Sequence, residues 1–220
     1  MSFELPDAGI VTCIFCSIVS GDADASWEAR PNSDSKVACF HNRLKWARVM
    51  LLIVPTNHMT QEELWSSDVM EDSAALAVEM GDKHCGDEGF RVISNFGLQA
   101  HQSQPHGHIH IVSGTSRQLQ NGVKKSGLSV NDGVCVEEYK IEETPFAARI
   151  SPTENATQRE LWTSPGILKT SRLALDSAMI HSPNGFRLMS SFDASSIDTP
   201  GGSNPASLYL LGGGQLGLYV

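Results

Sequence analysis

The sequence predicts an α+β protein in which an antiparallel sheet carries helices, and in which this unit is duplicated within one chain. Two observations support the prediction: the order of the elements and an internal repeat. In the first half, strand-like runs lie on both sides of a helical pattern, and the connections between them are short. Short connections favour antiparallel pairing, because parallel neighbours need long crossover segments.

The strands of the first half are predicted from apolar runs of strand length. Residues 37–40 and 49–54 are two such runs, and Pro55 ends the second. Residues 90–96 alternate between apolar and polar side chains, and a polar loop leads from them to a final segment, residues 102–114. Runs of this length and pattern are typical of strands with one or both faces buried.

A helical region is predicted between the second and third strands. Thr60 followed by Glu63 is the pattern of a capping box, in which each side chain satisfies a backbone N–H group at the start of a helix. From Asp68 to about Lys83 the apolar residues recur at helical spacing. We therefore expect an amphipathic helix that packs on one face of the sheet.

The internal repeat can be read directly from the letters. PTNHMTQEELWSS at residues 55–67 returns as PTENATQRELWTS at residues 152–164, with 8 of 13 positions identical. GFRVISNF at residues 89–96 returns as GFRLMSSF at residues 185–192, with 5 of 8 positions identical. Because order and spacing are both kept, the repeat indicates a duplicated supersecondary unit. Trp65 and Trp162 recur in both copies and are predicted to be core residues.

The repeat divides the chain into three predicted parts. Residues 1–115 form a first domain, residues 116–133 a polar connection with several glycines and lysines, and residues 134–220 a degenerate second copy. The two copies are expected to pair as an intramolecular pseudo-dimer.

The segment QSQPHGHIHIVSG at residues 102–114 contains the most unusual pattern in the chain. His106, His108 and His110 occupy every second position, so on a strand all three imidazoles would project from one face. Three histidines in register would crowd and titrate together, which is hard to explain by packing alone. Gly107 is a weak strand former and indicates a place where the backbone comes close to another segment.

This pattern resembles the signature of the histidine triad (HIT) family, in which three histidines alternate with hydrophobic residues. Asn95, Gly97 and the pair Gln102-Ser103 lie where nucleotide-binding HIT proteins have N-x-G and Q-S. Two positions depart from the family pattern: Gly107 stands at a hydrophobic position, and His101 where a small residue is usual. The resemblance implies a HIT-like fold and a nucleotide as substrate.

The resemblance also implies the chemistry. His108 would be the nucleophile that attacks the α-phosphorus and forms a covalent nucleotidyl-histidine, and His110 and Ser103 would contact the phosphate. A neutral imidazole is a good nucleophile near pH 7, and covalent catalysis divides one difficult displacement into two easier ones. Because position 110 is histidine rather than glutamine, the resemblance favours hydrolysis, including cleavage of nucleotide P–N bonds, over uridylyl transfer.

Further substrate contacts follow from the same resemblance. Asn95, Gln102, Ser103 and His110 are predicted to bind the substrate. Asn42 is also predicted to bind the substrate: it stands where family members often place an aspartate on the ribose hydroxyls, and an amide can still hydrogen-bond a hydroxyl.

A metal site is predicted from the second unusual spacing, Cys13 and Cys16. The C-x-x-C pattern alone serves both redox and metal sites. The resemblance to zinc-bearing HIT proteins adds His58 and His106 and implies a closed, structural Zn²⁺ site. An alternative is that the three triad histidines bind a catalytic metal themselves, which would leave the two cysteines without partners.

The second copy keeps the framework and loses the chemistry. Aligned on the strand end, His106, His108 and His110 correspond to Pro205, Ser207 and Tyr209. We therefore predict that the second copy is a scaffold.

Composition limits the partners and the location. A net charge of −9 argues against a nucleic-acid polymer, no stretch approaches a membrane span, and no secretory signal is recognisable. Five cysteines without a signal indicate reduced thiols and a cytoplasmic protein. The predicted partner is a small nucleotide, and the predicted state is a monomeric pseudo-dimer or a homodimer. The rival function is a nucleotide-binding sensor with little turnover.

Overall fold

The computed structural model describes residues 13–115, 123–141, 144–194, 198–200 and 206–214. Their backbone forms one antiparallel sheet of ten strands in the order β1-β2-β3-β5-β4-β9-β10-β8-β7-β6. The first half contributes β1 (Trp27–Ala29), β2 (Val37–His41), β3 (Met50–Pro55), β4 (Phe90–Phe96) and β5 (Ile109–Ser113). The second half contributes β6 (Val123–Asn131), β7 (Val134–Lys140), β8 (Ala147–Pro152), β9 (Phe186–Phe192) and β10 (Leu208–Gly212).

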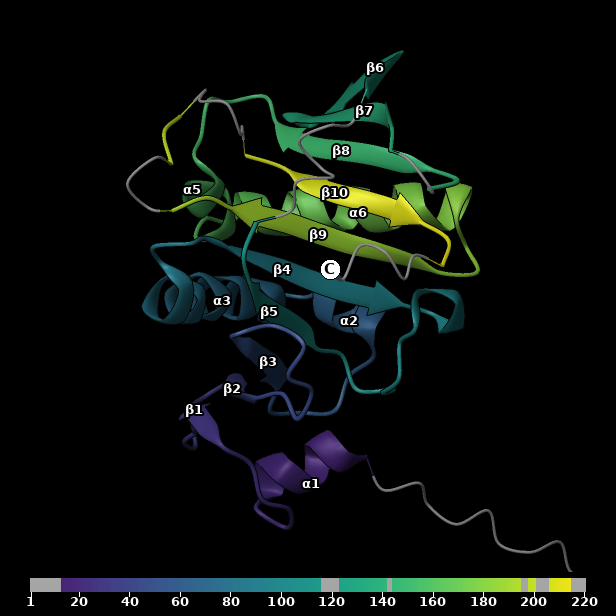
Figure 1. Cartoon of the computed structure of the whole chain (residues 1–220). Coiled ribbons are helices and arrows are strands. Elements are labelled where there is room, and N and C mark those ends of the chain that lie inside the picture. The colour runs from purple at the N-terminus through teal and green to yellow at the C-terminus, as the bar shows by residue number, and fades with distance from the viewer. Residues whose placement is uncertain (1–12, 116–122, 142–143, 195–197, 201–205, 215–220) are drawn as a thin grey trace, which may run out of the picture.

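Helices cover one face of this sheet (Figure 1). They are α2 (Gln61–Ser66), α3 (Val69–Cys85), α5 (Gln158–Trp162) and α6 (Gly166–His181). Two short helices complete the described elements, α1 (Ile14–Ser20) and η1 (Leu98–Ala100). The capping box predicted from Thr60 and Glu63 is present, and the same box occurs at Thr157 and Glu160 in the second half.

The two halves meet along a pseudo-two-fold axis at the middle of the sheet. β4 pairs antiparallel with β9, so that Phe90 lies opposite Phe192 and Phe96 opposite Phe186. Both phenylalanine pairs stack, with ring centroids 4.4 and 4.3 Å apart. The two fully buried tryptophans, Trp65 and Trp162, meet edge to face across the axis. The duplicated α+β fold predicted from the repeat is confirmed, and the halves share one core.

The connection between the copies contains a strand. Residues 123–131 of the predicted linker form β6, which pairs with β7 at the outer edge of the sheet. The polar composition that indicated a loop is equally compatible with an edge strand, since such a strand has solvent on several sides.

α1 packs on the opposite face of the first half from the other helices. Its Phe15 and Ile18 form a small apolar cluster with Phe40 and Leu52. The segment after Cys13 holds one seven-residue helix that ends at Gly21, whose φ of 88° suits glycine. α1 therefore closes the outer part of this face.

Candidate functional site

The site begins with the backbone of His108, which lies just before β5. The strand starts at Ile109, so only His110 of the three histidines lies within it. Gln61, the first residue of α2, replaces the missing strand contacts: its Nε2 donates to the carbonyl of His108 at 2.9 Å, and its Oε1 accepts from the His108 N–H at 2.8 Å. Ser94 Oγ donates to the same carbonyl at 3.0 Å. A polar framework on the helix side thus holds His108 in place.

Gly107 permits this arrangement. A Cβ at this position would lie 2.6 Å from the carbonyl oxygen of Thr60, closer than real Cβ contacts. The Gly107 N–H donates to the carbonyl of Met59 at 2.7 Å. The close backbone approach predicted from this glycine is confirmed, and it brings α2 near the triad.

The second half repeats the framework around a different residue. Gln158 makes the same two hydrogen bonds with the backbone of Ser207, at 2.9 and 2.8 Å, and Ser190 Oγ donates to the Ser207 carbonyl at 2.7 Å. Ser207 therefore occupies the place of His108, as the alignment predicts. Tyr209 lies opposite Met189, as His110 lies opposite Ile93; Pro205 lies outside the described residues.

These two glutamines provide a matched pair of variants. Gln61→Leu and Gln158→Leu should each lower the free energy of unfolding by about 2–4 kcal/mol, because each leaves a buried N–H and a buried carbonyl with fewer partners. Only Gln61→Leu should also reduce turnover, by about tenfold or more, since it alone releases the backbone of His108. Thermal melts and steady-state kinetics of both variants test this, and equal activities would contradict it.

The His108 imidazole has a defined tautomer. Its Nδ1 lies 2.8 Å from the carbonyl oxygen of His106, a contact that requires Nδ1 to carry the proton. Nε2 is then left with its lone pair. The ring packs edge to face against Phe15 of α1 at 5.3 Å and against His110 at 4.9 Å between centroids.

Burial keeps the triad neutral. It lowers the pKa of His108, and it lowers the pKa of His110 to about 3, with smaller contributions from the charges of His108 and Arg187. Near pH 7 both rings are therefore uncharged, so His108 Nε2 is able to act as a nucleophile.

Four predicted metal ligands lie together between α1 and the triad. The ligand atoms of Cys13, Cys16, His58 and His106 all lie within 4.8 Å of one another. Cys13 Sγ lies 3.4 Å and Cys16 Sγ 3.5 Å from His106 Nδ1, and Cys16 Sγ lies 3.3 Å from His58 Nδ1. This group can hold a metal ion.

These three distances fit a tetrahedral ion. Ligand atoms around a zinc ion bound by Cys and His are roughly 3.3–3.8 Å apart, which follows from bond lengths near 2.0–2.3 Å. His106 Nε2 lies 3.1 Å from the carbonyl oxygen of Pro55, so its Nε2–H donates there and Nδ1 is free for a metal. Because Nδ1 of His106 faces the two cysteines and its Nε2–H donates to Pro55, His106 has no ring nitrogen left to share a metal with His108 and His110.

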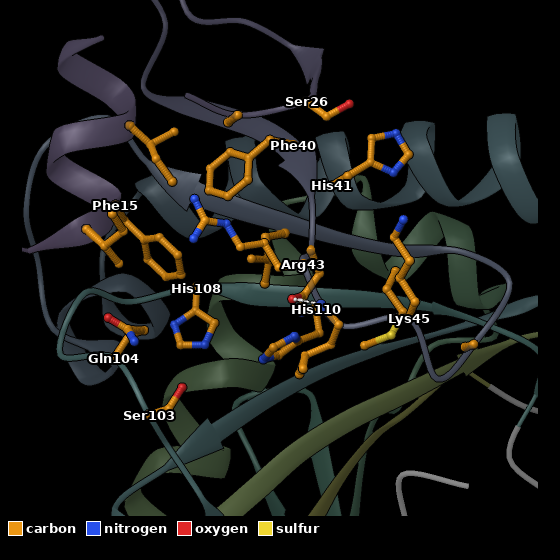
Figure 2. A pocket seen from close by; sticks show the side chains of 18 of the residues that line it. Phe15, Ser26, Phe40, His41, Arg43, Lys45, Ser103, Gln104, His108 and His110 are labelled. Carbon is orange, nitrogen blue, oxygen red and sulfur yellow. Dashed lines mark hydrogen bonds between the residues drawn. The ribbon is translucent and has the colours of Figure 1, made fainter. Parts of the chain in front are cut away.

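A cavity of about 1070 Å³ opens beside His108 and His110. Phe15, Phe40 and Leu52 supply an apolar part of its wall, while Arg43 and Lys45 add positive charge. Figure 2 shows Phe15, Phe40, Arg43 and Lys45 around the two histidines. A cavity with an apolar wall and a few polar groups is typical of a small-molecule site.

The structure brings some predicted substrate residues to this cavity and separates others. Ser103 and Asn42 line it. Asn42 Oδ1 accepts from the N–H of Leu44 at 3.0 Å. Gln102 instead ties its own loop, accepting from the Gly97 N–H at 2.9 Å and donating to the carbonyl of Gln104 at 3.0 Å.

Asn95 is not among the residues that line the cavity and lies near the end of β4. It is 3% exposed, and its Oδ1 accepts from Nε of Arg187 at 2.8 Å. Gln61, Phe15 and Arg187 are among the residues of this region that sequence reasoning did not assign to the site. Gln61 and Arg187 had a signal, because each is retained in the repeat, with Gln158 and Arg91 as their counterparts.

One carboxylate fastens the outer strand beside the cavity. Glu28 of β1 accepts from Lys83 at 2.9 Å and lies 2.8 Å from His41 and 2.9 Å from His84. Its hydrogen bond with Lys83 is the largest cause that lowers the pKa of this carboxyl to about 2. Glu28 thus joins β1 to both β2 and α3.

Because the pKa of Glu28 is lowered, we expect the stability of the fold to decrease as the pH falls. A group whose pKa is lower in the folded state stabilises the fold above its unfolded pKa of about 4.3 and loses that effect as pH falls towards about 2. We expect Glu28→Gln to lower the melting temperature at pH 7, equivalent to about 1–2 kcal/mol, and to melt like the wild type near pH 2. Glu62→Gln, an exposed control on α2, should change neither value.

Comparison with known proteins agrees with this architecture. Residues 32–117 match the family model described as "HIT domain". The adenosine 5'-monophosphoramidase hnt1 of Schizosaccharomyces pombe is 27% identical over 113 residues, which cover 51% of this chain and 82% of that protein. The family-model match lies in the first half and includes the triad.

Two solved structures resemble both halves. A galt-like protein from Arabidopsis thaliana superposes with a TM-score of 0.56 at 11% identity, over 93% of this chain and 82% of that one. The yeast Ap4A phosphorylase Apa2, in complex with AMP, gives a TM-score of 0.52 at 14% identity, over 81% and 56%. At these identities the likeness is one of fold. Within the described residues, no helix is long and apolar enough to cross a membrane.

Proposed function

We propose that the protein is a nucleotide hydrolase or transferase that acts at the α-phosphate of a nucleoside phosphate or phosphoramidate. The match of residues 32–117 to the HIT domain model supports this proposal. The observation that carries the proposal is His108. Its backbone is fixed by Gln61 and its Nδ1 proton is held by the His106 carbonyl. It also lines the cavity.

The reaction has two displacements in this proposal. The lone pair of His108 Nε2 attacks the α-phosphorus, the bond from phosphorus to the leaving group breaks, and the leaving amine or oxygen takes up a proton. Water then attacks the nucleotidyl-histidine, the P–N bond to His108 breaks, and the nucleoside monophosphate is released. Each displacement is easier than a single direct hydrolysis.

The neighbours of His108 have supporting roles. Ser103 and His110 line the same cavity and provide an O–H and an N–H donor for the phosphate oxygens (Figure 2). We assign Ser103 as a hydrogen-bond donor to the leaving group. The proton that this group takes up comes from solvent water, because a serine hydroxyl and the neutral His110, with a pKa of about 3, are both poor sources of a proton.

The metal group is assigned to Zn²⁺. Two thiolates and two imidazoles suit this ion best, and four protein ligands leave no open position for a substrate. Zinc there would stabilise the fold: it would join α1, through Cys13 and Cys16, to His58 and to the triad segment at His106. Phe15 would then stay packed against His108.

A nucleotide sensor is the second candidate. The hydrogen bond of Asn42 favours it: its Oδ1 accepts from the N–H of Leu44 and is less available to a ribose hydroxyl. The ribose contacts that an aspartate makes in HIT proteins would therefore be weaker here, and turnover would be slow.

The test uses adenosine 5'-phosphoramidate labelled at the α-phosphate, with the purified full chain. Turnover to AMP, together with a label bound to the protein after an alkaline quench and located by mass spectrometry at His108, is the expected result. Alkali is needed because a phosphorus–histidine bond is acid-labile. AMP binding without turnover of nucleoside phosphoramidates or dinucleoside polyphosphates would instead identify a sensor.

A further inference from the structure

A buried arginine from the second half reaches towards the triad. Arg187 lies on β9 and is 1% exposed, and it is among the largest fully buried side chains of the described residues. Its Nε donates to Asn95 Oδ1 of β4 at 2.8 Å. Burying a guanidinium is unfavourable unless hydrogen bonds compensate it, so this side chain is held at a defined place.

The strand register puts this arginine in a row that ends beside the nucleophile. β4 pairs with β9 so that Asn95 lies opposite Arg187. β4 pairs with β5 so that Ile93 lies opposite His110. His108 lies two residues before His110, and Asn95 two residues after Ile93, so they are the next residues on the same face beyond this pair. Asn95 and Arg187 therefore form a row across β4 and β9, and His108 lies beside the end of this row, just before β5.

The pseudo-two-fold axis repeats this row with different residues. Arg91 corresponds to Arg187 and lies opposite Ser191 of β9. Ser191 and Ser207 are each two residues beyond the pair of Met189 and Tyr209, so Ser207 lies beside the end of this second row. Each row therefore ends beside a residue whose backbone is hydrogen-bonded by a glutamine: His108 by Gln61, and Ser207 by Gln158. Only the row of the first half ends beside a histidine, and in that row an asparagine stands between the arginine and the histidine.

We propose that Arg187 is a positioning residue for the reaction of the first half, so that the degenerate second half completes the active site. It acts through Asn95, whose amide it orients beside His108, and it supplies a fixed positive charge near the point where a phosphoryl group gains negative charge. This inference rests on the proposed function of His108.

Two features support an action at the triad. The charge of Arg187 contributes to the lowered pKa of His110, so its field reaches the triad. A preorganised charge acts more strongly when it is buried, as Arg187 is, than when it is exposed to solvent. The scaffold role predicted for the second half is thereby extended: its framework would carry one residue that the active half lacks.

The experiment compares Arg187→Gln with its pseudo-symmetric control, Arg91→Gln. Both remove a buried guanidinium from the same sheet face, at 1% and 6% exposure, and should lower the melting temperature by similar amounts. We expect Arg187→Gln to lower kcat by about 10- to 100-fold with little change in KM, and Arg91→Gln to stay within about threefold of the wild type.

Arg187→Lys keeps the positive charge and is the variant to measure if Arg187→Gln does not fold. It should recover part of kcat, and the combination of Arg187→Gln with Asn95→Ala should be no slower than the worse single variant. Equal kinetic losses in Arg187→Gln and Arg91→Gln, or fully additive effects with Asn95→Ala, would overturn the inference.

AMP binding measured by calorimetry separates this inference from the proposed function. A wild type without turnover would refute the enzyme but not the role of Arg187 at the site. In that case, a loss of AMP affinity of about tenfold in Arg187→Gln and none in Arg91→Gln would support the inference. Equal affinities in the two variants would refute it.

Discussion

Replacing His108 by alanine is expected to reduce turnover by about a thousandfold or more, since the substitution removes the atom that would form the bond to phosphorus. The fold should remain, because Gln61 and Ser94 bind the backbone of residue 108 and not its side chain. Steady-state kinetics with adenosine 5'-phosphoramidate, together with a thermal melt, measure both effects. The labelled protein adduct should disappear in the same variant.

Ser207→Ala is the matched control for this substitution. Ser207 has the same backbone contacts from Gln158, so the substitution tests whether a change at this framework position affects activity by itself. It should leave turnover within about twofold. A His108→Ala protein that keeps more than a tenth of wild-type turnover would show that His108 is not the nucleophile, and His110 would then be examined.

Much of the fold was predictable because local and long-range signals agree. Thr60, Gln61 and Trp65 recur with their counterparts 97 residues later, and this repeat indicates the duplication from the letters alone. The capping boxes act locally, within one helical turn, so their residues can be read from spacing alone. The four proposed metal ligands lie together, as the resemblance to zinc-bearing HIT proteins implied.

The features that were not predictable depend on tertiary contacts. Asn95 lies opposite Arg187 because β4 pairs with β9, in a register in which Phe90 and Phe96 stack on their counterparts. No spacing in the sequence records it. The late start of β5 at Ile109 has a similar cause: Gln61, 47 residues away, takes the hydrogen bonds that a neighbouring strand would otherwise make.

Gln102 has a role in its loop that its family position does not indicate. Its place in the Q-S pair predicts substrate binding, and its side chain also joins two parts of its own loop, through Gly97 and Gln104. It fixes the loop that carries Ser103 to the cavity. A short motif cannot distinguish these two uses, since both need a polar side chain at the same position.

Loss of the metal is expected to have the second large effect. Cys16→Ser should abolish the binding of about one zinc ion per chain and lower the free energy of unfolding by several kcal/mol, because a closed site contributes its binding energy to the fold. Cys16 is the thiol whose Sγ lies near both His58 and His106. Metal analysis and thermal melts of the purified variant provide the measurement.

The reason for a large effect is that few other contacts hold α1. Phe15 and Ile18 of α1 belong to a small apolar cluster that is separate from the main core, and the helix is only seven residues long. Short helices are not stable by themselves, so α1 should detach when the metal is lost. Phe15 would then leave the ring of His108, and turnover should fall by about tenfold although no residue of the triad has changed.

Cys135→Ser serves as the control, since Cys135 lies on β7, in the second half, outside the metal group. It should retain the zinc content and the activity of the wild type. Treatment of the wild type with a chelator should reproduce the Cys16→Ser melt, and added zinc should reverse it. A wild type that contains no zinc, or a Cys16→Ser protein that keeps both its zinc and its stability, would show that the four side chains pack together for another reason.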